Sequence, residues 1–202
     1  MCGVVGFSCN NATEENYNIL YDIIKQSKIR GLHSFGYSYY DNKIKKKKHH
    51  NIKDIKLPKA NKIIYHNRYS TSGDHMDHNN NQPIHSNNIS LVFNGVLDMR
   101  TKQEIEEDYN IKMQTENDGE IIIQKCGNNI DKIKKFVKTT NGSFAGLFLL
   151  NDTMIAIRNK NRPLWKLEHL NAVYYASTKD IFKRINKNFN PSQLKENVIY
   201  EN

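Results

Sequence analysis

The sequence lacks any long apolar run. No stretch approaches the ~20 consecutive apolar residues that a membrane-spanning helix needs, and the N-terminus has no apolar segment like that of a secretory signal. Cysteine is scarce as well: the chain has only Cys2, Cys9 and Cys126. An odd number of cysteines without metal-binding spacing argues against a disulfide framework and indicates a reducing compartment. We therefore expect a cytoplasmic protein with no membrane association.

The chain is basic but lacks the patterns of a nucleic-acid-binding protein. Lys and Arg total 30 against 21 for Asp and Glu, a formal net charge of +9. There is no basic helix with interleaved aromatic residues and no zinc-finger or RNP-type motif. Lysine and asparagine are spread along the whole chain, as expected from the compositional bias of an AT-rich genome. Nucleic-acid binding is therefore not expected.

Two polar stretches could hold an ion. His75 and His78 are spaced as metal ligands can be, but no cysteine or further histidine completes a site, so no metal is expected. The run Lys45–Lys48 is most simply a solvated hairpin tip or loop. A phosphate-binding patch is the alternative interpretation of the same run.

A chain of 202 residues is long enough for one domain with a sizeable core. Predicted strands come in adjacent pairs and predicted helices are grouped between them, which favours antiparallel sheets flanked by helices. Thr13 is the expected N-cap of a helix that ends near Arg30-Gly31. The pair Asn94-Gly95 predicts a tight turn with positive φ. The remaining expected strands are residues 3–7, 35–39, 63–65, 90–93, 143–150, 154–158 and 172–176, and the expected helices are 101–108, 120–126, 130–137 and 180–185.

Cys2 stands directly behind the initiator methionine. Removal of Met1 would leave a thiol and a free α-amine on one residue. Their ordinary pKa values are about 8.5 and about 8, so the amine can accept the proton of the thiol near neutral pH. This is the logic of an N-terminal nucleophile. The alternative is that Cys2 is an ordinary small residue at the start of a strand.

Several short motifs follow one another along the chain. They are Cys2-Gly3-Val4-Val5-Gly6, Arg30-Gly31, Arg68-Tyr69-Ser70-Thr71-Ser72-Gly73, Gln82-Pro83, Asn94-Gly95, Asn117-Asp118-Gly119-Glu120, Asn141-Gly142-Ser143-Phe144-Ala145 and Arg162-Pro163-Leu164. In this order they resemble the class II glutamine amidotransferases, and most of all the glutaminase half of the amidophosphoribosyltransferases. The resemblance implies an α+β fold of the N-terminal-nucleophile (Ntn) hydrolase type, a four-layer αββα sandwich of two antiparallel sheets between helix layers. It also implies a single glutaminase domain over residues 1–202 without a fused acceptor or synthase domain.

The resemblance assigns roles to individual residues. Arg68 would bind the α-carboxylate of glutamine, because a guanidinium is a planar bidentate donor, and Asp118 would bind its α-ammonium group. Asn94 and the backbone N–H of Gly95 would stabilise the oxyanion that forms when Cys2 attacks the side-chain amide. The substrate-binding residues also include Tyr69 and Thr71, whose hydroxyl is expected to hold the glutamine-binding loop. Phe93 and Ser72 depart from the family pattern, since some relatives have histidine at these positions.

The implied activity is hydrolysis of L-glutamine to glutamate and ammonia, with no cofactor. The ammonia would pass to a separate ammonia-accepting synthase subunit, for which the basic surface could be a docking face. A homo-oligomer is compatible with the sequence. Two alternatives remain open: a catalytically quiet glutamine-sensing or interaction module, and an Ntn hydrolase that acts on another amide.

Overall fold

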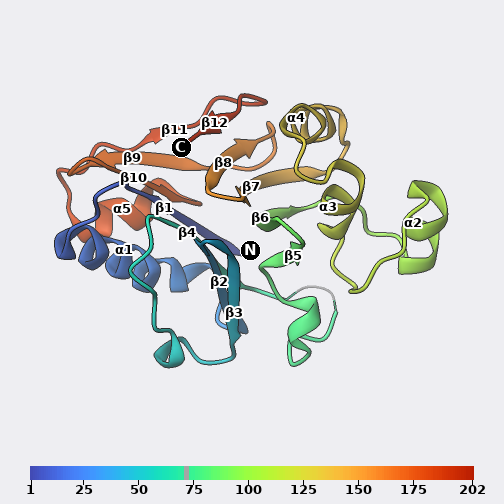
Figure 1. Ribbon diagram of the computed structural model, residues 1–202, viewed down its shortest axis with the longest axis horizontal. Helices are drawn as coiled ribbons and strands as arrows, with labels where there is room; N and C mark the ends of the chain where they lie inside the picture. Colours follow the sequence, from blue (N-terminus) through green and yellow to red (C-terminus); the bar gives the residue numbers. More distant parts are fainter. Residues whose placement is uncertain (71–72) are drawn as a thin grey trace.

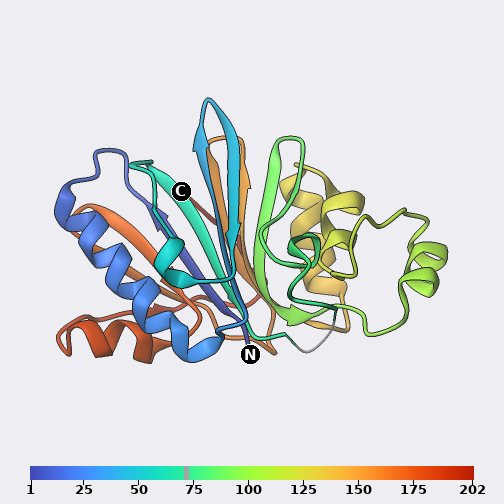
Figure 2. The same cartoon turned by 90° about the horizontal axis from the view of Figure 1, so that it is seen from below.

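The computed structural model describes residues 1–70 and 73–202. Two antiparallel sheets lie face to face, with α1 and α5 on one outer side and α3 and α4 on the other (Figures 1 and 2). The seven-stranded sheet has the order β11-β9-β10-β1-β4-β2-β3, and the five-stranded sheet the order β12-β8-β7-β6-β5. This confirms the predicted α+β sandwich of two antiparallel sheets between helix layers.

The bounds of the elements follow the chain in order. The strands are β1 (Gly3–Ser8), β2 (Ser34–Asp41), β3 (Lys43–His49), β4 (Lys62–Arg68), β5 (Ile84–Ser86), β6 (Ile89–Val96), β7 (Ser143–Leu150), β8 (Thr153–Arg158), β9 (Trp165–His169), β10 (Ala172–Ala176), β11 (Ser192–Gln193) and β12 (Tyr200–Glu201). The helices are α1 (Glu14–Ser27), α2 (Lys102–Tyr109), α3 (Glu120–Cys126), α4 (Ile130–Thr139) and α5 (Lys179–Ile185), with short 3-10 helices at Lys28–Arg30, Ile52–Asp54 and His78–Asn80.

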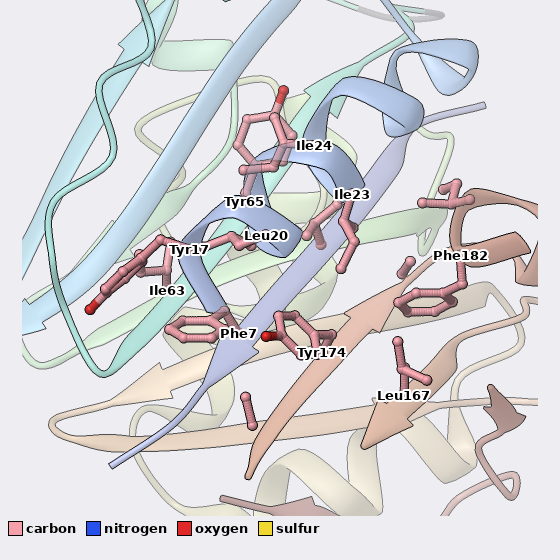
Figure 3. Packing of buried hydrophobic residues seen from close by; sticks show 14 of the residues in the cluster. Phe7, Tyr17, Leu20, Ile23, Ile24, Ile63, Tyr65, Leu167, Tyr174 and Phe182 are labelled. Atoms are coloured by element: carbon pink, nitrogen blue, oxygen red, sulfur yellow. The ribbon is translucent and has the colours of Figure 1, made fainter. Parts of the chain in front are cut away.

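Strand β1 lies inside the seven-stranded sheet and is buried on both faces. Val5 and Phe7 point toward α1, where Phe7 packs beside Tyr17, Leu20 and Tyr174 (Figure 3). Val4, on the opposite face, packs between the two sheets. Successive side chains of a strand alternate between faces, so an unbroken apolar run is the pattern expected for a strand that is covered on both sides.

Strand β6 has the same double burial in the five-stranded sheet. Leu91 and Phe93 join the core under α3 and α4, while Val92 packs against Leu147 in the layer between the sheets. The molecule therefore has three apolar layers, one on each helix-covered face and one between the sheets. None of the helices in the described part of the chain is long and apolar enough to cross a membrane.

The predicted start of α1 is confirmed. The Thr13 side chain accepts a hydrogen bond from the Asn16 backbone, and the Asn16 side chain accepts one from the Thr13 backbone, which makes a capping box. The α-helix ends at Ser27, and the last predicted residues form the 3-10 turn Lys28–Arg30. Gly31 follows with an extended φ of 171°.

Two local predictions were wrong. Lys45–Lys48 is not a hairpin tip: it lies within β3, paired with β2, and the reversal is made by Asn42, directly before β3, with φ 57°. Asn94-Gly95 is not a turn with positive φ, because both residues lie within β6, where Gly95 pairs with Phe144. Strand pairing with β7 overrode the local turn preference. β5, β9 and the two-residue strands β11 and β12 had not been predicted, since each has five residues or fewer and offers only a short pattern.

Candidate active site

Three strand ends meet at one small cavity. It is bordered by the residue before β1, the end of β4, the end of β6, and the segments around residues 82 and 116–118. The lining residues are Cys2, His66, Arg68, Tyr69, Gln82, Phe93, Gly95, Glu116, Asn117 and Asp118. The structure thus brings together five of the predicted site residues. Asn94 is buried directly beside Gly95, whereas Thr71 lies outside the described residues.

The pairing of β1 with β4 sets the position of the thiol. Gly3 pairs with Asn67 and Val4 with His66, so Cys2 lies at the level of Arg68. Along β4, His66 and Arg68 share the face that borders the cavity. Asn67 points to the other face, where its Nδ2 donates to the carbonyl oxygens of Ser27 (2.9 Å) and Gly31 (3.0 Å).

Cys2 is partly buried, and its Sγ contacts the carbonyl oxygen of Tyr69 at 3.7 Å. Burial raises the pKa of the thiol, while the nearby N-terminal amine and the guanidinium groups of Arg68 and Arg30 act in the opposite direction. Arg30 also donates from Nε to the Cys2 carbonyl oxygen at 3.2 Å. The thiol is therefore protonated until a base accepts its proton, and the surrounding charges favour the thiolate once it forms.

Met1 occupies the position next to Cys2. Its side chain is 61% exposed, and its sulfur contacts guanidinium nitrogens of Arg30 (3.6 Å) and Arg162 (3.4 Å). Burial lowers the pKa of the α-amine, and the charges of the two arginines lower it further. A lower pKa leaves a larger fraction of this amine in the neutral form near pH 7, and only the neutral form can accept a proton.

Arg68 is buried, and its guanidinium is held in a fixed position. Nη1 donates to Asn81 Oδ1 at 2.6 Å, and Nη2 donates to the carbonyl oxygen of Gly73 at 3.2 Å. Asn81 is itself anchored, because its Nδ2 donates to the His75 carbonyl oxygen at 2.8 Å. The polar segment before Gln82 therefore orients this cation beside the cavity.

Asp118 brings a carboxylate to the opposite wall. Its Oδ2 accepts hydrogen bonds from the backbone N–H groups of Leu97 (2.6 Å) and Asp98 (3.1 Å). Burial raises the pKa of Asp118, and these two bonds oppose the rise. A cationic group bound in the cavity would favour the ionised carboxylate further.

Asn94 is the clearest unsatisfied group near the cavity. Its side chain is 4% exposed, and its Nδ2 has no hydrogen-bond partner among the residues that the structure describes. Leaving a buried donor unpaired costs about 1–3 kcal/mol, so such an amide is suited to a ligand oxygen. The neighbouring position must be glycine, because a Cβ on Gly95 would lie 2.0 Å from the Ser143 carbonyl oxygen.

His66 borders the cavity but was not among the predicted site residues. It is 1% exposed, and neither ring nitrogen makes a well-formed hydrogen bond with the described residues, although the Phe93 backbone interacts with the ring. Burial and the charge of Arg68 lower its pKa to about 3, so the imidazole is neutral near pH 7. The alternation along β4 could have placed His66 on the same face as Arg68. Gln82 also had no assigned role; its Oε1 accepts from the Phe93 N–H at 2.6 Å.

Three solved structures share this fold. The glutamine phosphoribosylpyrophosphate amidotransferase of B. subtilis matches with a TM-score of 0.71 and 19% identity over 100% of this chain and 49% of that one. A structure described as the allosteric regulatory enzyme of purine biosynthesis matches with a TM-score of 0.75 and 25% identity over 96% and 45%. A class-II domain glutamine aminotransferase protein from Silicibacter pomeroyi matches with a TM-score of 0.58 and 10% identity over 100% and 98%. The chain thus spans about half the length of the first two.

No curated protein matches the sequence at a significant level. The family model for the glutamine amidotransferase domain matches residues 66–184, which is more than half of the chain. That range contains Arg68, Asn94, Gly95 and Asp118, whereas Cys2 precedes it. The two-sheet architecture agrees with the Ntn-hydrolase fold of the matched amidotransferases. The chain therefore belongs to the glutamine amidotransferase domain family, and within it to the class II, Ntn-type domains.

Proposed function

We propose that this chain hydrolyses L-glutamine to glutamate and ammonia, with Cys2 as the nucleophile. One observation carries the proposal: β1, β4 and the segment before α3 bring a thiol, a guanidinium and a carboxylate to one cavity, and β6 brings Gly95 to its lining with the Asn94 amide buried next to it. These four groups are far apart in sequence. Together they complement the α-carboxylate, the α-ammonium group and the side-chain amide of an amino acid such as glutamine.

Substrate recognition follows from the two charged groups. Arg68, oriented by Asn81 and Gly73, would bind the α-carboxylate through charge-assisted hydrogen bonds. Asp118 would bind the α-ammonium group, with Tyr69 and Thr71 completing the substrate-binding residues. A ligand held at both charged ends presents its side-chain amide to Cys2.

The chemistry requires that Met1 has been removed, so that the α-amine belongs to Cys2. The amine takes the proton of the thiol, directly or through one water, and Sγ attacks the side-chain carbonyl carbon of glutamine. Asn94 Nδ2 and the Gly95 N–H donate to the resulting oxyanion. The C–N bond then breaks, and ammonia leaves with the proton that the α-ammonium group returns. Water hydrolyses the γ-glutamyl thioester, which releases glutamate and restores the thiol.

The ammonia is the product that a biosynthetic partner would use. We propose that residues 1–202 act as the glutaminase domain and that a separate synthase subunit accepts the ammonia. The matched phosphoribosylpyrophosphate amidotransferase has as many residues again outside the half that this chain matches.

The test is ammonia release from glutamine by the full chain. We expect turnover by the wild type, none above background by Cys2→Ala, and wild-type turnover by Cys9→Ala, a control thiol at the far end of β1. A protein that binds glutamine but releases no ammonia would instead be a sensing module. Turnover of another amide with no turnover of glutamine would contradict the assigned substrate.

A further inference from the structure

A second and larger cavity lies at the open edge of the sandwich. It has a volume of about 770 Å³ and lies between β3, the edge strand of one sheet, and β5, the edge strand of the other. Four basic side chains line it: Lys46, Lys48, His85 and Lys112. Ile84, Ile89 and Ile123 contribute apolar surface to the same cavity. It shares no lining residue with the candidate active site.

Strand register explains why these two lysines line the cavity. In the β2–β3 pair, Lys48 is opposite Gly36 and Lys46 is opposite Ser38. The Ser38 hydroxyl lies 2.7 Å from the Ser90 hydroxyl of the facing sheet, so this face of the hairpin turns toward the second sheet (Figure 2). Lys43 and Lys47 occupy alternate positions and therefore lie on the opposite face.

The positive charges at this cavity are not matched by ion pairs. No carboxylate forms a salt bridge with Lys46, Lys48 or Lys112 among residues 1–70 and 73–202. Lys48 is half-buried, and its Nζ donates to the His78 carbonyl oxygen at 2.7 Å. Burial and the neighbouring Lys46 lower the pKa of Lys48 to about 8. His85 Nδ1 is shielded from solvent and has no partner in the described chain.

Two carboxylates lie near the lysines without neutralising them. Asp77 acts on Lys48 only through its longer-range charge. Glu120 lines the cavity, but both of its oxygens already accept hydrogen bonds from the chain. Its donors are the backbone N–H groups of Gln114 and Thr115, the Thr115 hydroxyl and Gln124 Nε2. These neutral donors hold the Glu120 carboxylate in place but leave its charge, so the excess of positive charge comes from three lysines against this one carboxylate in the lining.

We propose that this cavity binds a small phosphorylated metabolite, with the phosphate beside Lys46, Lys48 and Lys112 and the organic part against Ile84, Ile89 and Ile123. A phosphate monoester carries up to two negative charges, which suits several ammonium groups better than a single carboxylate does. The volume falls within the usual range for small-molecule sites. A mixed lining of apolar surface and a few charged groups is also characteristic of such sites.

The proposal is independent of glutamine hydrolysis and can be tested in the Cys2→Ala variant. The probe is glycerol 3-phosphate, titrated by calorimetry at low ionic strength, with uncharged glycerol as the control ligand. We expect saturable binding of one equivalent. Lys46→Gln/Lys48→Gln should weaken it by about 10-fold or more, since two charge-assisted contacts are lost. Lys43→Gln/Lys47→Gln, which removes the same net charge from the other face of β3, should change it by less than about two-fold.

Three results would overturn the proposal: no saturable binding of glycerol 3-phosphate, equal binding of glycerol, or an equal loss in the two double variants. The last would mean that the probe responds only to net charge. If Lys46→Gln/Lys48→Gln fails to fold, Lys112→Gln takes its place, because Lys112 lies in the segment between α2 and α3, outside both sheets. Unchanged binding in a folded Lys112→Gln protein would then contradict the site.

Discussion

The two faces of β4 differ in what their polar side chains contact. On the face toward α1, Asn67 Nδ2 donates to two backbone carbonyl oxygens at the end of that helix, while Asn67 Oδ1 and the Tyr65 hydroxyl make no well-formed hydrogen bond with the described residues. On the face toward the cavity, neither ring nitrogen of His66 makes a well-formed hydrogen bond with the described residues, and Asn94 Nδ2 of the facing sheet has no partner among them. Buried polar groups in folded proteins are nearly always paired. We infer that Asn67 serves the fold and that the second face, which borders the cavity, is organised for a ligand.

The largest expected effect tests the cavity face alone. Cys2→Ala should lower glutamine turnover by at least about 10³-fold, because removing a nucleophile eliminates the covalent route. Among the described residues, the thiol makes a single hydrogen bond, a long one to the Tyr69 carbonyl oxygen, so the melting temperature should stay close to that of the wild type. Ammonia release and thermal unfolding measured on the same preparation check both parts. If Cys2→Ala lost activity only because it unfolds, Cys2 would be a residue that serves the fold, and the cavity face would not differ in this respect from the face toward α1.

Two asparagines make a matched pair for the next test. Asn94→Ala should reduce kcat by about 10²–10³-fold, as expected for the loss of one oxyanion donor, without loss of stability, since its Nδ2 has no partner among the described residues. Asn67→Ala should lower the free energy of unfolding by about 1–3 kcal/mol, because the two carbonyl oxygens lose their donor. Urea unfolding and steady-state kinetics of both variants decide the matter. Equal losses of stability would mean that Asn94 is a structural residue.

The third test concerns the cation on the cavity face. Arg68→Lys keeps the charge but loses the planar, two-nitrogen geometry that contacts Asn81 and Gly73. We expect the KM for glutamine to rise by about 10- to 100-fold, the effect of one lost charge-assisted hydrogen bond, with a smaller change in kcat. An unchanged KM would exclude Arg68 from binding the substrate.

The smallest expected effect is a pH dependence of stability. The pKa of His66 is lowered to about 3 in the folded chain, against about 6.5 when unfolded. Between these values the unfolded state binds the proton and the folded state does not, so stability falls as the pH drops below 6.5. From pH 7 to pH 5 this histidine should cost about 2 kcal/mol.

His66→Gln should remove that part of the pH dependence. The measurement is urea unfolding of wild type and variant at pH 7 and pH 5; taking the difference between the two proteins cancels the contribution of the other histidines. Identical pH dependence in the two proteins would show that protonating His66 carries no burial penalty in the folded state and that its ring nitrogens are hydrated.

Much of the fold could be predicted from local patterns. The apolar run after Cys2 predicted β1, and Thr13 predicted the start of α1. Two errors share a cause: pairing with β7 made Asn94-Gly95 part of a strand, and pairing with β2 did the same for Lys45–Lys48. The motif order predicted five residues of the cavity lining, yet His66 was missed. Its importance rests on burial and missing partners, which depend on the opposite sheet.

The most direct measurement is the mass of the N-terminal peptide from active protein, quenched in acid during turnover of glutamine. The account predicts a peptide that begins at Cys2 and carries a γ-glutamyl group on its sulfur. Ammonia release by a chain that retains Met1, or turnover without any adduct on Cys2, would contradict it.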